Sequence, residues 1–225
     1  MIFLKRHNVR GLIEAFILYL LLFLQGIFPV NDFPSAIVFS PSGALLRFFI
    51  YTVPALVLLS YLLFYKKNKE GEKATLNLPR FALKDVRVFA LCFTGLVFTG
   101  FIISFAADFF TPSPNPAKIT MPPDFFAYFV MIVSAMSIGY LEEIFFRVYL
   151  IKRIRDAGVG LMRSVLLSSV MFALCHIYAG QWSVLNAAVA GLGLAFVYTR
   201  YLSVHGIALA HGVYNIFVHI AGQFF

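Results

Sequence analysis

The chain has 225 residues, of which 61% are hydrophobic, 17% are aromatic and only 12% are charged. About a quarter of the residues of a soluble domain are charged, so this composition excludes an ordinary soluble protein. The formal net charge of +8 does not indicate nucleic-acid binding, because the basic residues gather beside the apolar runs and not along one groove. Cys92 and Cys175 both fall in apolar runs, which predicts neither a disulfide nor a metal motif.

Repeated apolar runs of near 20 residues predict an all-α, polytopic membrane helix bundle with about seven transmembrane helices. The expected spans are about 11–29, 44–65, 88–107, 125–151, 160–178, 183–200 and 205–222. The first run follows a basic stretch, as in a signal peptide. It is long for a signal peptide, however, and no persuasive small-residue cleavage site follows it, so we expect it to be retained as a span.

The basic residues are divided unequally between alternate connecting segments. Fifteen of the 18 lie in the N-terminal segment and in the second, fourth and sixth connections. These are Lys5, Arg6, Arg10, Lys66, Lys67, Lys69, Lys73, Arg80, Lys84, Arg87, Lys152, Arg153, Arg155, Arg163 and Arg200. The opposite side has only Arg47 and Lys118, and Arg147 lies inside a span. The positive-inside rule then predicts a cytoplasmic N-terminus and an external C-terminus.

The connecting segments divide the chain into three expected parts. Residues 1–110 hold spans one to three and the basic cytoplasmic loop 66–87. Residues 111–124 form an external loop, and residues 125–225 hold spans four to seven. Residues 111–123 contain five prolines, so we expect an extended segment over the outer surface. A short interfacial helix is expected near Leu83 to Val88. In span six, small residues recur every four positions and predict close helix packing; these are Ala187, Gly191 and Ala195.

Charged residues in span four are the most informative feature of the chain. Glu142, Glu143 and Arg147 lie in an apolar stretch, where each charge costs roughly 2.5–3.5 kcal/mol on the insertion scale. On a helix Glu143 and Arg147 are four apart and can pair, whereas Glu142 is rotated by about 100° and can face elsewhere. Either Glu142 serves as a general base in a cavity, or all three groups form a buried ionic cluster that joins helices.

Two later spans contribute further polar side chains. Span five places Phe172 and His176 four apart, and span seven places His211 and Asn215 four apart with His219 further along the same stripe. Hydrogen bonding between helices would also explain these residues. Together with the glutamates, however, they supply what hydrolysis needs: groups that deprotonate water and groups that donate to an oxyanion. Because no HExxH motif and no recognisable serine or cysteine nucleophile is present, we expect water to be the nucleophile.

Three motifs in this order resemble a known family. Residues 142–147 (EEIFFR) match EExxxR, Phe172 to His176 match FxxxH, and His211 to Asn215 match HxxxN. They resemble the CPBP family, which comprises type II CAAX prenyl endopeptidases and related bacteriocin-processing or self-immunity proteins. The resemblance covers roughly residues 125–220 and makes 125–225 the expected catalytic core.

The resemblance implies an intramembrane glutamic endopeptidase without cofactor or metal. In it, Glu142 and His176 would activate water, His211 and Asn215 would form the oxyanion site, and three supporting residues would position them; these are Glu143, Arg147 and Phe172. The expected partners are the lipid bilayer and a membrane-associated or lipidated protein or peptide. A prenylated CAAX protein, a secreted peptide and a C-terminal sorting anchor remain open as substrates. A bacterial plasma membrane is expected from the small size and the family.

Two other functions fit the same residues. A non-catalytic immunity or peptide-binding protein would use the polar core to hold a peptide, and a proton-coupled transporter would also need buried Glu and His. The absence of internal repeats in the sequence argues against the transporter. One difficulty concerns depth: counted from the cytoplasmic helix ends, His211 is roughly 9 Å deep, Glu142 about 14–18 Å and His176 roughly 24 Å. Tilt, or extension of spans four and five beyond the bilayer, must bring them together.

Overall fold

The computed structural model describes residues 6–28, 36–37, 39–66, 75–76, 79–112, 118–120 and 122–221. Helices form nearly all of this part, and the only extended pairs within it join two residues each, so the predicted all-α bundle is confirmed. β1 (Ala36–Ile37) pairs in parallel with β4 (Lys118–Ile119), and β2 (Tyr65–Lys66) pairs antiparallel with β3 (Thr75–Leu76). The β4 residues tie part of the predicted external loop to the chain after the first helix, while residues 113–117 and 121 of that loop lie outside the described ranges.

Six helical segments among the described residues are long and apolar enough to cross a membrane, as expected for a multi-pass integral membrane protein. They are α1 (Arg6–Phe23) with η1 (Leu24–Ile27); α2 (Pro41–Arg47) with η2 (Phe48–Thr52) and α3 (Val53–Phe64); α4 (Leu83–Phe110); α5 (Phe125–Glu143) with η3 (Ile144–Leu150) and α6 (Ile151–Asp156); α8 (Gln181–Tyr201); and α9 (Val204–Ala221). The remaining helix, α7 (Leu161–Leu174), is 14 residues long and is followed by η4 (Ile177–Ala179). The prediction of about seven spans is therefore close, but the fifth helix is shorter than the expected 160–178.

Helix starts follow local capping chemistry. Ser40 precedes Pro41 and accepts a hydrogen bond from the Gly43 amide, and Asp124 accepts one from the Ala127 amide at 2.8 Å. At the start of α4 the Ala82 amide donates to Asp85, which also accepts the Ser203 hydroxyl.

This arrangement corrects one expectation. Leu83 to Val88 do not form a separate interfacial helix but are the first turns of α4, because Asp85 and Val88 are buried against the start of α9.

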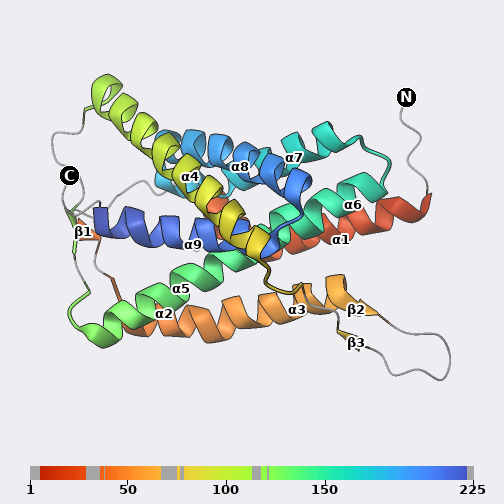
Figure 1. Cartoon of the computed structure of the whole chain (residues 1–225), viewed down its shortest axis with the longest axis horizontal. Coiled ribbons are helices and arrows are strands. Elements are labelled where there is room, and N and C mark those ends of the chain that lie inside the picture. The colour runs from red at the N-terminus through yellow and green to blue at the C-terminus, as the bar shows by residue number, and fades with distance from the viewer. Residues whose placement is uncertain are drawn as a thin grey trace.

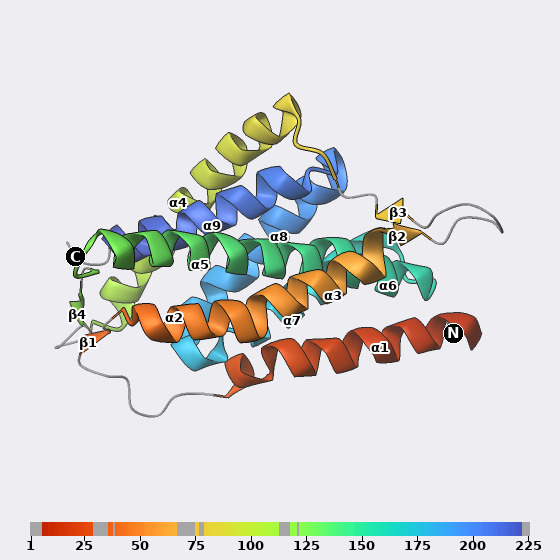
Figure 2. The ribbon, with the colours of Figure 1, turned by 90° about the horizontal axis from the view of Figure 1, so that it is seen from below.

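The helices lie roughly along one direction, with α4 and α5 crossing the bundle obliquely (Figure 1). The start of α1, the β2–β3 pair and α6 lie at one end, and β1 and β4 lie at the other, as two perpendicular views show (Figures 1 and 2). The described parts of the basic connections therefore gather at one end, as expected. The side of the membrane that this end faces stays a prediction.

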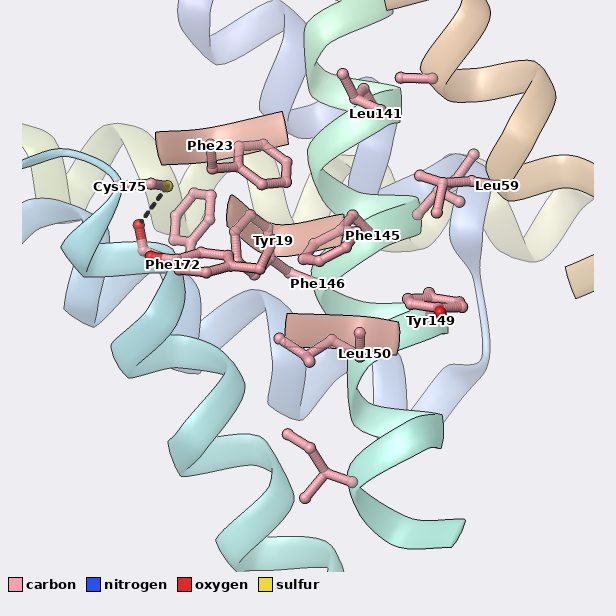
Figure 3. Close-up of a cluster of buried hydrophobic side chains, with 14 of the residues drawn as sticks. Tyr19, Phe23, Leu59, Leu141, Phe145, Phe146, Tyr149, Leu150, Phe172 and Cys175 are labelled. Carbon is pink, nitrogen blue, oxygen red and sulfur yellow. Dashed lines mark hydrogen bonds between the residues drawn. The ribbon is translucent and has the colours of Figure 1, made fainter. Parts of the chain in front are cut away.

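An aromatic cluster fills the centre of the bundle. Tyr19 and Phe23 of α1 pack against Phe145 and Phe146 of η3, with the Phe23–Phe146 ring centroids 4.8 Å apart (Figure 3). Phe172 of α7 adds a ring 5.1 Å from that of Phe146. These side chains are at most 6% exposed and closely packed. Their packing holds η3, and with it the polar residues of span four, in a fixed position.

Close packing of α8 confirms the interpretation of its small-residue stripe. Ala187 and Ala195 are buried, and a Cβ atom on Gly191 would lie 3.0 Å from the Phe172 ring. The small side chains therefore let α8 approach α7 closely, so that α8 packs against the Phe172 ring.

Candidate active site

The two adjacent glutamates end α5, immediately before the π-helical segment η3. Glu143 and Arg147 are both 0% exposed, and their Oε2 and Nε atoms lie 3.1 Å apart. The guanidinium carbon of Arg147 lies 4.6 Å from the centroid of the Phe172 ring. The predicted Glu143–Arg147 pair therefore exists, and it is buried against an aromatic face.

Glu142 faces away from this pair, as its rotation on the helix predicts. Its side chain is 15% exposed and lines a cavity of about 490 Å³. The π-helical turns that follow it fit this arrangement, since π segments are rare and occur frequently at functional sites. One glutamate is thus neutralised by arginine while its neighbour is open to the cavity.

His211 joins the two glutamates from the facing helix α9. Its Nδ1 lies 2.9 Å from Glu143 Oε1, and its Nε2 lies 3.5 Å from Glu142 Oε2. A carboxylate can only accept, so Nδ1–H donates to Glu143 and fixes the ring. The sequence predicted His211 beside Asn215 but did not indicate that it would bridge both glutamates.

Two glycines allow this contact. A Cβ atom on Gly139 would lie 2.7 Å from the backbone nitrogen of Gly212, so α5 and α9 touch backbone to backbone. Gly139 is one turn before Glu143, and Gly212 follows His211 directly. The crossing point therefore sets the distance between the carboxylates and the imidazole.

His176 reaches the site from beyond a helix end. The expectation that span five holds Phe172 and His176 on one helix is only partly right, because α7 ends at Leu174. The chain turns at this point, yet the Phe172 and His176 rings remain 4.8 Å apart. His176 Nδ1 lies 2.8 Å from the Phe172 carbonyl oxygen, and a carbonyl can only accept, so Nδ1 carries the proton. In the neutral ring Nε2 is then free to accept a hydrogen bond from water.

The predicted catalytic residues meet at one cavity. Glu142, His176, His211 and Asn215 all line the space of about 490 Å³. The last three also line a neighbouring cavity of about 210 Å³, together with Phe172. The two histidines and the amide thus stand where the two cavities adjoin.

The supporting residues lie behind these groups. Phe172 is 2% exposed, and besides its contact with the Arg147 guanidinium its ring lies 5.8 Å from that of His211. His219, left without a role by the sequence, lines neither cavity, and its ring lies 6.0 Å from that of Phe39.

Several residues of the site escaped sequence reasoning. Arg47, Tyr51 and Tyr178 also line the larger cavity. The distribution of basic residues places Arg47 on the external side and gives it no role in the site, although a lone arginine inside an apolar run also indicates function. The Gly139 and Gly212 contact carried no signal, because a single sequence does not show which glycines face each other.

A metal ion has no evident set of ligands here. Within the described ranges no group of three or more His, Cys, Asp and Glu side chains has an arrangement that could hold one. The metal-independent mechanism stays a prediction. The hydrogen bond from His211 to Glu143 and the unconstrained Nε2 of His176 suit acid–base chemistry on water.

Comparison with known proteins gives one match. Residues 123–217 match the sequence model of the family described as "Type II CAAX prenyl endopeptidase Rce1-like". This range contains all seven residues singled out from the sequence, which agrees with the resemblance to the CPBP family. Neither the curated proteins nor the solved structures gave a match.

Proposed function

We propose that this protein is a metal-independent intramembrane glutamic endopeptidase, because residues 123–217 match the sequence model of the Rce1-like type II CAAX prenyl endopeptidase family, a family of proteases. Its substrates would be membrane-associated or lipidated proteins or peptides, and its place would be a bacterial plasma membrane. The observation that carries the proposal is the cavity on which Glu142, His176, His211 and Asn215 converge.

The reaction begins with a water molecule held by Glu142 and His176. Nε2 of His176 accepts a hydrogen bond from the water, because its Nδ1–H is engaged by the Phe172 carbonyl. Glu142 removes a proton, and the water oxygen attacks the carbonyl carbon of the scissile amide. The carbonyl oxygen becomes an oxyanion as the C–O bond forms.

Two groups stabilise that oxyanion. His211, protonated on both ring nitrogens, donates through Nδ1 to Glu143 and through Nε2 to the oxyanion, and the Asn215 amide supplies a second hydrogen bond. When the tetrahedral intermediate collapses, the C–N bond breaks and Glu142 returns its proton to the leaving amine. The carboxylate is regenerated, so one water is consumed for each bond cleaved.

Each supporting residue has a physical role in this scheme. The Arg147 guanidinium balances the charge of Glu143 and leaves that carboxylate free to hold His211. The Phe172 ring contacts the Arg147 guanidinium and lies beside both histidine rings. These contacts restrict the rings to the orientation that the reaction needs.

The test compares cells that express the wild-type chain with cells that express Glu142→Ala or His176→Ala. Mass spectrometry of membrane peptides should reveal cleavage products that depend on both residues and persist in the control His219→Ala, which lies outside both cavities. Full processing by either cavity variant would refute the mechanism. Protection against a bacteriocin by the cleavage-deficient variants would instead favour an immunity or binding protein.

A further inference from the structure

Arg47 is the cationic side chain of the larger cavity that the reaction scheme does not use. It ends α2 and lines the cavity together with Glu142 and His176. Its side chain is exposed, and the side chains of Tyr51 and Tyr178 line the same cavity. The guanidinium is therefore available to a molecule that enters the cavity.

Arg47 also lacks a carboxylate partner in the part of the chain that the structure describes. None of the ion pairs formed there includes it, whereas Arg147, which is buried behind the cavity, is paired with Glu143. Glu142, the cavity carboxylate, is engaged by His211. An unpaired arginine within an apolar span is costly and is a marker of function.

The backbone next to Arg47 is also unusual. The π-helical segment η2 begins at the following residue, and the Thr52 hydroxyl donates to the Arg47 carbonyl oxygen at 3.5 Å. Among the described residues, the two π-helical segments thus start close to cavity residues: η3 two residues after Glu142 and η2 directly after Arg47. Such segments are frequent at functional sites, which points independently to Arg47.

We propose that Arg47 is a specificity-determining residue that binds a carboxylate of the peptide substrate. The planar guanidinium offers paired donors that match the two oxygens of a carboxylate. A cavity of 490 Å³ equals a sphere about 10 Å across, which holds about three extended residues at roughly 3.3 Å each. The bound carboxylate therefore lies within about three residues of the scissile bond, as a chain terminus or as an acidic side chain. This assignment rests on the proposed protease function.

The experiment uses one farnesylated, internally quenched decapeptide in three forms: with a free C-terminal carboxylate, as a C-terminal amide, and as an amide with a penultimate glutamate. We would measure kcat/KM for the wild type, Arg47→Gln, Arg47→Lys and the exposed control Arg163→Gln, each in phosphatidylcholine vesicles with and without phosphatidylglycerol. In parallel, the dissociation constants of unquenched peptides would be measured on Glu142→Gln, with and without Arg47→Gln. Binding is thereby tested without catalysis.

Wild type and Arg163→Gln should prefer a carboxylate form over the plain amide by about 10- to 100-fold, since hydrogen bonds to charged groups contribute on this scale. Arg47→Gln should remove the preference by weakening only the carboxylate forms, and Arg47→Lys should keep part of it. The form preferred identifies the source, a chain terminus or an acidic side chain.

Equal binding of the carboxylate and amide forms, or no saturable binding of any form, would overturn the assignment. A loss in Arg47→Gln that is equal for all peptides and changes with phosphatidylglycerol would assign Arg47 to a lipid phosphate, which also overturns it. If no form is cleaved but the carboxylate preference persists in binding, the protease proposal fails while the role of Arg47 stands.

Discussion

The crossing of α5 and α9 at Gly139 should control catalysis more strongly than stability. A Cβ atom at this position would lie 2.7 Å from the Gly212 nitrogen, 2.9 Å from its Cα and 3.0 Å from the Ala208 carbonyl oxygen. Non-bonded heavy atoms normally approach to about 3.5–4.0 Å, so Gly139→Ala must push the two helices apart by roughly 1 Å. All three neighbours are backbone atoms, and no side chain can rotate to relieve the clash.

The displacement acts directly on the site. It should lengthen the 2.9 Å contact between His211 and Glu143 and the 3.5 Å contact between His211 and Glu142. Overpacking costs about 1–3 kcal/mol of stability, whereas a 1 Å misplacement of catalytic groups can cost about 100-fold in rate. We therefore expect Gly139→Ala to remain folded and to lose about 100-fold in kcat/KM.

The assay measures kcat/KM for the farnesylated peptide in vesicles and Tm in detergent. Gly95→Ala is the matched control, because a Cβ atom there would meet nothing within 4 Å. If Gly139→Ala cleaved the peptide as fast as Gly95→Ala, the close crossing would not set the catalytic geometry.

Four further substitutions test the supporting residues and the Asn215 amide. Glu143→Gln or Arg147→Met alone should each lower the unfolding free energy by about 3–5 kcal/mol, because a buried charge loses its partner, and the double variant should recover part of this in denaturant titration. Phe172→Ala should cost about 3–5 kcal/mol in the same titration, since its ring is 2% exposed; a loss below about 1 kcal/mol would contradict the packing described. Asn215→Ala should lower kcat by about 100- to 1,000-fold with little change in KM, and steady-state kinetics showing a change in KM alone would assign it to substrate binding.

Much of this arrangement could be predicted from periodicity and spacing. The apolar runs located the spans, and the four-residue spacing of Glu143 and Arg147 predicted their pairing and the separate direction of Glu142. The same spacing placed Phe172 beside His176, although the helix ends between them. Local geometry is predictable because one helical turn fixes which side chains are neighbours.

The depths of the catalytic residues were harder to predict. The continuous helical segment from Phe125 to Asp156 has 32 residues and is about 48 Å long, well beyond the roughly 30 Å of a bilayer core. His176 lies two residues beyond the 14-residue α7 and still lines the same cavity as Glu142. A count from ideal bilayer boundaries places the two residues at different depths, because it treats every span as straight and flush with the bilayer.

Contacts between helices that are far apart along the chain cannot be predicted from one sequence alone. The hydrogen bond of His211 to Glu143 and the contact of Gly139 with Gly212 depend on how α5 and α9 cross. The place of Arg47 in the cavity depends likewise on the rotation of α2 and on the π turn after it. Such features follow from packing between elements and not from the period of any one of them.

The most direct measurement is the single-turnover cleavage of the farnesylated peptide by Glu142→Gln, made alongside its binding affinity and Tm. Glutamine keeps the shape of the side chain but cannot take a proton from water, so cleavage should fall by at least about 100-fold while binding and Tm stay near those of the wild type. The control Glu14→Gln changes a glutamate that pairs with Arg153 away from the cavity, and should cleave normally. Cleavage by Glu142→Gln at the wild-type rate would contradict the claim that this carboxylate activates the attacking water.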